Sequence, residues 1–200
     1  MIGIINYGTG NIGSIYNMLR KIGAEVEICS NFDEVNKCKK IIIPGVGSYD
    51  NAIEKLESSG LFECIKEKAV EGTPILGICL GMQLLGTTSQ EGKLRGLNLI
   101  PGHVMHFPDD IGLRVPHMGW NMVDFTEEEM GKNLLKNNKF YFVHRYFFVP
   151  QSKSYIAGFT EYGLKFSSFI KKDNIYGVQF HPEKSHKYGM LLLKNFNDMK

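Results

Sequence analysis

Short apolar runs alternate with helical patterns along the first half of the sequence. The runs of strand length are Ile2–Asn6, Glu25–Cys29, Lys40–Pro44 and Pro74–Cys79. The stretches with helical periodicity lie at about residues 11–22, 48–58 and 61–71. Parallel neighbours in a sheet need a crossover connection, and the crossover helices then cover the sheet. The first half therefore predicts an α/β fold with a mostly parallel central sheet and helices on both faces.

The second half contains short strand-like runs between turn residues. These runs are Gly102–Phe107, Trp120–Phe125, Phe140–Val149, Tyr155–Thr160, Leu164–Ile170 and Ile175–Phe180. Such a succession predicts antiparallel strands added to the parallel core. A last helix is expected at about residues 184–197. No linker, repeat or low-complexity stretch divides the chain, so a single domain over residues 1–200 is the simplest prediction.

Composition excludes several classes of protein. A hydrophobic content of 43% and a charged content of 22% are ordinary for a globular protein. A formal net charge of +2 does not indicate the basic surface of a nucleic-acid-binding protein. The N-terminus lacks the features of a signal peptide, and no apolar stretch approaches the roughly 18 residues that cross a bilayer. The cysteines, at positions 29, 38, 64 and 79, lack zinc-ligand spacing. We expect reduced thiols in a cytoplasmic protein, with no metal and no organic cofactor.

The sharpest local signal surrounds Cys79. The segment Gly77-Ile78-Cys79-Leu80-Gly81 follows an apolar strand and opens a helical run, which is the nucleophile-elbow pattern with cysteine in place of serine. The two glycines allow a tight strand-to-helix turn, and the helix N-terminus favours a thiolate. The alternative is a small buried cysteine that enters a helix between packing glycines.

Two further segments suit a cysteine nucleophile. His181 ends a strand and Glu183 follows two positions later, so the carboxylate is able to orient the imidazole beside Cys79 as in a nucleophile–histidine–acid triad. The turn Pro44-Gly45-Val46-Gly47-Ser48 follows another apolar strand and exposes backbone amides that suit an oxyanion hole. Alone, either segment is as readily an ordinary turn at a strand end.

Together, these segments resemble class I, triad-type glutamine amidotransferases. Within that class, the match is to the glutaminase subunits of imidazole glycerol phosphate synthases. The most specific segment is Pro116-His117-Met118-Gly119-Trp120-Asn121, and Tyr141-Phe142-Val143-His144 and Gln179-Phe180-His181-Pro182-Glu183 add to it. The similarity runs from Gly3 to about Phe196, nearly the whole chain.

The resemblance implies a role for each group. Cys79 attacks the glutamine carboxamide, His181 supplies a proton to the departing ammonia, and Glu183 holds His181. The oxyanion hole is formed by the backbone amide of Leu80 with that of Val46 or Gly47, after a rearrangement of the turn. The residues expected to bind substrate are Gly45, Gln83, Arg145 and Tyr146. The residues expected to meet a partner are Asn11, Ser14, His117, Met118, Gly119, Trp120, Asn121, Tyr141 and His144. That partner is a cyclase or synthase subunit with a (β/α)₈ barrel, which receives the ammonia.

Some positions depart from the family pattern. Arg145 stands where a small hydroxyl residue is usual, close to where the backbone of glutamine is held, and Gly13 and His106 stand where arginine is common. These changes keep open a paralogous glutaminase that supplies ammonia to a barrel partner in bacterial surface-sugar biosynthesis. A catalytically impaired partner-binding scaffold is a second alternative, which Arg145 favours. A cysteine peptidase or amidase is a third, but it leaves the segment 116–121 unexplained.

Overall fold

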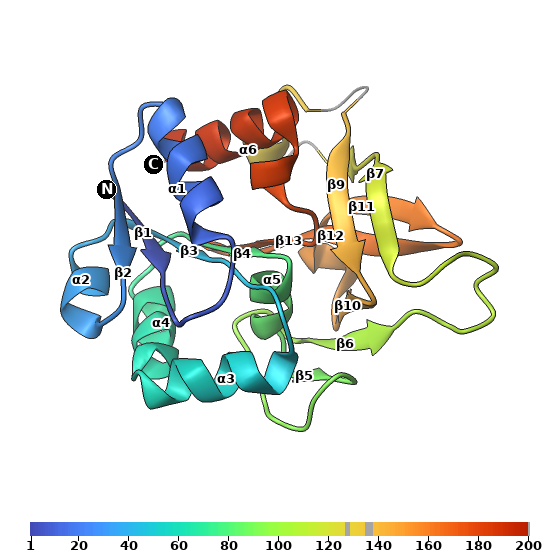
Figure 1. Ribbon diagram of the computed structural model, residues 1–200, viewed down its shortest axis with the longest axis horizontal. Helices are drawn as coiled ribbons and strands as arrows, with labels where there is room; N and C mark the ends of the chain where they lie inside the picture. The colour runs from blue at the N-terminus through green and yellow to red at the C-terminus, as the bar shows by residue number, and fades with distance from the viewer. Residues whose placement is uncertain (127–128, 135–137, 200) are drawn as a thin grey trace.

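Five parallel strands form one half of the central sheet. The computed structural model describes residues 1–126, 129–134 and 138–199, and its α/β architecture is shown in Figure 1. The parallel strands are β1 (Ile2–Ile5), β2 (Val26–Cys29), β3 (Lys40–Ile43), β4 (Ile75–Ile78) and β13 (Ile175–Val178). They lie in the order β2-β1-β3-β4-β13. The parallel sheet predicted from the alternating pattern is therefore confirmed.

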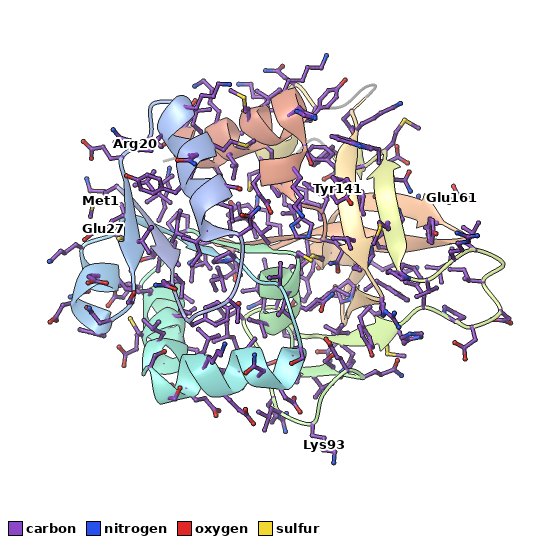
Figure 2. All side chains as sticks on the ribbon, viewed as in Figure 1. Met1, Arg20, Glu27, Lys93, Tyr141 and Glu161 are labelled. Atoms are coloured by element: carbon purple, nitrogen blue, oxygen red, sulfur yellow. The ribbon has the colours of Figure 1, made fainter. Side chains whose placement is uncertain are left out.

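Helices cover both faces of this half. Figure 1 shows α1 (Ile12–Lys21) and α6 (His186–Asp198) on one side of the sheet, with α3 (Tyr49–Ser58) and α4 (Leu61–Val70) on the other. Side chains of β3 alternate between the two layers: Ile42 packs into the core under α1 and α6, whereas Ile41 and Ile43 pack into the core under α3 and α4. Burial on both faces explains why this strand is a continuous apolar run rather than an alternating one. Figure 2 shows the charged side chains Arg20, Glu27, Lys93 and Glu161 around the outline of the molecule.

Antiparallel strands extend the sheet beyond β13, as predicted. They are β12 (Leu164–Lys172), β11 (Ile156–Tyr162), β10 (Tyr146–Pro150), β8 (Asp124–Phe125) and β6 (Gly102–His106), with β5 (Thr88–Ser89) parallel to β6 at the edge. Short 3₁₀ turns occur at η1 (Glu129–Gly131) and η2 (Lys153–Tyr155). Among the described residues, every helix is too short or too polar to cross a lipid bilayer.

The structure differs from the sequence prediction where the chain changes sheets. The run predicted as one strand over Phe140–Val149 is two strands, β9 (Phe140–His144) and β10, because the chain bends at Arg145. β9 leaves the main sheet and pairs with β7 (His117–Asn121) in a separate two-stranded sheet. The run predicted over Trp120–Phe125 is likewise divided between β7 and β8.

A short helix, α2 (Phe32–Asn36), was absent from the prediction. Its five residues are too few to give a helical period in the sequence. The Asn31 side chain begins the helix by accepting the Glu34 N–H at 3.1 Å, which is ordinary N-terminal capping.

A buried asparagine ties the end of β7 to the approach of β9. The Asn138 side chain accepts the Val123 N–H at 2.9 Å and donates to the carbonyls of Val123 and Leu134, both at 2.7 Å. Asn138 is only 3% exposed, so water cannot easily replace these bonds. The Asn138 side chain thus takes the place of backbone hydrogen bonds at a point where the pairing of the strands is interrupted.

We predict that Asn138→Ala lowers the free energy of unfolding by about 2–4 kcal/mol, because it leaves three buried backbone groups without partners. Urea denaturation followed by circular dichroism measures the change. Asn51→Ala is the matched control, since Asn51 is exposed on α3, and it changes stability by no more than about 0.5 kcal/mol. Equal stabilities for the two variants would contradict the bridging role.

Candidate active site

The carboxyl ends of β3, β4 and β13 meet at one edge of the parallel half. The register pairs Val178 of β13 with Ile78 of β4, and Ile43 of β3 with Gly77 of β4. The segments that follow these three strands therefore emerge side by side. They carry the turn at Gly45, the nucleophile candidate Cys79 and the histidine candidate His181.

Cys79 occupies a tight turn between β4 and the short helix α5 (Leu80–Leu84). Its φ of 55° lies in the left-handed region, which is uncommon for a residue with a side chain and typical of functional sites. The glycines around it permit a very close backbone approach. A Cβ on Gly81 would lie 1.9 Å from the Ile43 carbonyl oxygen, and a Cβ on Gly77 would lie 2.5 Å from the Gly81 carbonyl oxygen. The structure thus has the tight elbow that the glycine spacing predicts.

His181 and Glu183 form a buried pair next to Cys79. His181 Nδ1 lies 2.9 Å from Glu183 Oε1, and the two side chains are 2% and 1% exposed. His181 Nε2 is buried and has no partner of hydrogen-bonding geometry among the described residues, so it is the ring nitrogen left for Cys79. Burial alone would lower the pKa of His181, but the neighbouring Cys79 and Glu183 outweigh it and raise the pKa to about 10. The two neighbours therefore favour the charged form of the imidazole.

The backbone bonds of neighbouring segments hold this histidine in place. His181 donates its N–H to the Tyr141 carbonyl at 2.9 Å, and its own carbonyl accepts the Ser185 hydroxyl at 2.6 Å. The Tyr141 N–H in turn donates to Ser185 Oγ at 3.0 Å. These bonds tie β9 to the turn η3 (Pro182–Lys184), which carries Glu183. The position of the imidazole thus depends on β9 as well as on β13.

The glycine turn after β3 packs directly against the elbow. A Cβ on Gly45 would lie 2.8 Å from the Gly81 nitrogen, so only glycine fits there. The Tyr7 hydroxyl donates to the Pro44 carbonyl at 2.6 Å and fixes the start of the turn, and burial raises the pKa of Tyr7 to about 12. Among the described residues, no acceptor takes the N–H of Val46 or Gly47. Neither amide is therefore engaged within the described part of the chain.

A cavity of about 330 Å³ joins these groups. Its lining residues are Val46, Gly47, Cys79, Leu80, Gln83, Glu91, Pro116, Val143, His144, Arg145, Tyr146 and His181. Gln83 Nε2 donates to the Tyr146 carbonyl at 3.2 Å and to Gln179 Oε1 at 3.1 Å. Gln179 Nε2 in turn points at Cys79 Sγ from 3.7 Å. The cavity thus combines a candidate nucleophile, a charged acid and a set of fixed amides.

The family of this chain is established by comparison with known proteins. Residues 3–199 match the family "Glutamine amidotransferase class-I". The chain belongs to this amidotransferase family. It is 48% identical to "Imidazole glycerol phosphate synthase subunit HisH 2" of Methanococcus maripaludis, with 98% of each chain covered. It is 44% identical to "Imidazole glycerol phosphate synthase subunit HisH" of Moorella thermoacetica, with 99% of this chain and 94% of that one covered. It is 40% identical over the full length of both chains to "Imidazole glycerol phosphate synthase subunit HisH 2" of Pseudomonas aeruginosa.

Solved amidotransferase structures share the fold. A "Crystal structure of glutamine amidotransferase" superposes with a TM-score of 0.77 over 98% of both chains at 14% identity. The "Structure of PurLQS from Thermotoga maritima" superposes with a TM-score of 0.75 over 97% of this chain and 95% of that one at 16% identity. At such identities the likeness concerns the arrangement of helices and strands alone.

The substrate-binding candidates of this amidotransferase meet at the cavity. Gln83, Arg145 and Tyr146 all line it, and Gly45 lies at its edge in the turn that supplies Val46 and Gly47. Arg145 is exposed at the bend between β9 and β10, and its side chain makes no ion pair within the described residues. The departure from the family pattern therefore places an unpaired cation at the cavity wall.

The expected partner-facing residues divide into three sets by exposure. On β7, Met118 and Trp120 are 61% and 48% exposed, with Trp120 stacked on His186 at a ring distance of 5.4 Å. His117 and His144 are 2% and 6% exposed, so their side chains face the interior rather than the surface of this chain. The two-residue period of a strand turns them toward the interior while their neighbours face outward. The other candidates, Asn11, Ser14, Gly119, Asn121 and Tyr141, are half-buried.

Three residues at the site were missed by sequence reasoning. Gln179 donates toward the Cys79 sulfur, Tyr7 holds the turn after β3, and Glu91 lines the cavity. Gln179 carried the clearest signal, because it is a polar residue in an otherwise apolar run, two positions before His181. Tyr7 and Glu91 lie in loops with no motif, and only the fold brings them to the cavity.

We predict that Cys79→Ala lowers the pKa of His181 from about 10, because it removes the neighbouring group that raises this pKa most. An NMR titration of the imidazole measures the change, and Glu183→Gln moves the pKa in the same direction. Cys64→Ala is the matched control, since Cys64 is a buried cysteine on α4, away from the cavity, and it leaves the titration unchanged. A wild-type His181 that titrates near 6.5 would refute the charged pair.

Proposed function

We propose that this chain is the glutaminase subunit of an imidazole glycerol phosphate synthase, which hydrolyses glutamine and passes the ammonia to a synthase subunit in histidine biosynthesis. The observation that carries the proposal is the buried His181–Glu183 pair beside Cys79, at the wall of a cavity large enough for an amino acid. The names of relatives at 40–48% identity over nearly the full chain support the pathway.

The chemistry follows from the charges at the site. The Cys79 thiolate attacks the side-chain carbonyl carbon of glutamine, and the oxygen becomes an oxyanion that accepts hydrogen bonds from backbone amides of Leu80 and of Val46 or Gly47. The His181 imidazolium gives its proton to the departing nitrogen, so ammonia leaves and a thioester remains. The neutral imidazole then takes a proton from water, and the resulting hydroxide releases glutamate and restores the thiolate. Glu183 stabilises the imidazolium in the first half of this cycle.

Opposite charges at the cavity suit the two ends of a free amino acid. Arg145 is placed to pair with the α-carboxylate, and Glu91 is the carboxylate on the same cavity wall that suits the α-ammonium group. Gln83 offers its side-chain oxygen, because both of its N–H groups are already engaged. Gly45 and Tyr146 contribute backbone near the same positions.

We assign the partner face to the exposed apolar side chains of β7, Met118 and Trp120, flanked by Gly119, Asn121, Tyr141, Asn11 and Ser14. A (β/α)₈-barrel cyclase subunit is the proposed partner, in a heterodimer. Exposed apolar side chains of this size are typical anchors of protein interfaces. The chain acts in this proposal as one glutaminase domain over residues 1–200 in the cytoplasm, and the reaction calls for neither metal nor organic cofactor.

A second candidate is a paralogous glutaminase that supplies a barrel partner in surface-sugar biosynthesis. Two of the relatives carry the name "subunit HisH 2", which suggests that their organisms encode more than one such subunit. Arg145 is the departure in the cavity that accompanies this candidate. The glutaminase chemistry is the same in both, since the acceptor binds to the partner.

We predict that Cys79→Ala abolishes glutamine hydrolysis, because no other cysteine among the described residues lines the cavity and is placed to form the thioester. Glutamate release measures the loss, and the Cys64→Ala variant retains the wild-type rate. Binding to the synthase partner survives in Cys79→Ala, since the exposed side chains of β7 are unaltered. A Cys79→Ala variant that still hydrolyses glutamine refutes the assignment, and a wild-type chain inactive with its partner favours the scaffold alternative.

We predict that the ammonia is incorporated when the chain is combined with the barrel subunit and the histidine-pathway intermediate. Product formation from glutamine, with ammonium salts as the positive control for the barrel subunit, measures this. Incorporation only into a nucleotide-linked sugar would overturn the pathway and establish the second candidate, while leaving the glutaminase assignment intact.

A further inference from the structure

A chain of hydrogen bonds runs from β7 into the wall of the cavity. The Asn121 side chain donates to the Glu161 carbonyl at 2.9 Å, and its Nδ2 lies 3.3 Å from His117 Nε2. His117 Nδ1 lies 3.0 Å from His144 Nε2, and His144 Nδ1 lies 2.8 Å from the Tyr146 carbonyl oxygen. Four strands, β7, β9, β10 and β11, are joined by these contacts.

The positions of the protons in this series of hydrogen bonds follow from the groups at its two ends. A carbonyl oxygen only accepts, so His144 carries its proton on Nδ1 and its Nε2 accepts. His117 must then donate from Nδ1. Its Nε2 accepts a proton from the NH₂ group of Asn121, because this nitrogen is a donor only. Every bond is satisfied when both rings are neutral. A second proton on either ring would place two hydrogen-bond donors opposite each other, with no acceptor between them.

The chain continues from the Tyr146 carbonyl to the nucleophile. Gln83 Nε2 donates one proton to this carbonyl and the other to Gln179 Oε1, which fixes the orientation of both amides. Gln179 therefore presents its NH₂ to Cys79 Sγ, 3.7 Å away. The side-chain oxygen of Gln83 is left for the cavity, which Gln83 lines.

Burial enforces the neutral form of both histidines. His117 lies between the rings of Phe142 and Tyr162, at centroid distances of 4.7 and 4.0 Å and nearly parallel to both. Burial lowers the pKa of His117 to about 4 and that of His144 to about 3. The one protonation pattern that satisfies every bond is therefore also the pattern that the apolar surroundings favour at neutral pH.

We propose that His117 and His144 are positioning residues of the glutamine cavity, which act through the Tyr146 carbonyl on Gln83 and Gln179 as one hydrogen-bonded chain from β7 to Cys79. The proposal rests on the proposed glutaminase function and deepens it. His144 lines the cavity, and His117 lies behind it and is not among the lining residues. Together they set which face of the Gln83 amide the substrate meets, so their loss weakens glutamine binding more than it slows the chemical step.

The protonation pattern is tested on the unaltered full chain. Long-range ¹H–¹⁵N correlation spectra distinguish the two neutral forms of each imidazole. We expect both rings to be neutral at pH 7 and to carry their protons on Nδ1. A ring with its proton on Nε2, or a ring that titrates near 6.5, overturns the proposal whatever the variants below do.

Two variants of His117 separate hydrogen bonding from packing. His117→Phe keeps a ring between Phe142 and Tyr162 but donates nothing, whereas His117→Asn loses the ring and keeps an N–H close to the position of Nδ1. We expect His117→Phe to raise KM for glutamine about tenfold, as one lost buried hydrogen bond does, with kcat within about threefold. His117→Asn recovers most of this loss. If His117→Asn raises KM for glutamine more than His117→Phe does, the His117 ring acts through packing alone, and the proposal is overturned.

Phe166→Leu is the matched control, because Phe166 packs against both His117 and His144 and makes no polar contact with either. It lowers stability and leaves KM within about twofold, which is the expected size of an indirect effect at a position outside the polar chain. A wild-type chain that fails to hydrolyse glutamine counts against the proposed function. An active wild-type chain whose KM is unchanged in His117→Phe counts against the hydrogen-bonded chain alone.

Discussion

The in-register pairing of β4 with both β3 and β13 is the constraint on which the site depends. Residues after the three strands, near positions 45, 79 and 181, are far apart in the sequence and become neighbours only because the strands end together. The backbone of Gly81 then lies against the Ile43 carbonyl, where a side chain of any size would collide. The elbow, the glycine turn and the histidine thus share one edge of the sheet, as ligands and catalytic groups commonly do in parallel α/β folds.

Groups of opposite charge lie next to each other at this edge, which lowers the free-energy cost of burying them. An isolated buried carboxylate or thiolate is strongly unfavourable, and it is stabilised only by good geometry with an opposite charge. In this protein the His181 imidazolium lies between Glu183 and Cys79, and within the described residues Glu183 makes its one side-chain contact through Oε1. Both neighbours raise the pKa of His181, so loss of either one lowers it, and the effects of substituting these residues are not expected to add.

The parts of the site that could be predicted are those fixed by local sequence. The glycines at 77 and 81, the apolar strand before Cys79 and the His181–Glu183 spacing identify their geometry without the rest of the chain. The change of sheet at Arg145 could not be predicted, because the apolar pattern continues through it and only tertiary pairing separates β9 from β10. The inward direction of the His117 side chain could not be predicted for a similar reason. A strand has two faces, and its sequence alone does not say which one the core covers.

The small sheet of β7 and β9 therefore has two connections to the cavity. One passes through His144 to the Tyr146 carbonyl and the amides behind Cys79, and the other passes through the Tyr141 backbone to His181 and Ser185. The first ends at the wall of the cavity, and the second ends at His181. Because both begin on β9, and β9 pairs residue for residue with β7, a shift of the exposed β7 face would move the cavity wall and His181 together. A contact made outside the cavity is thus able to change two parts of the site through one strand.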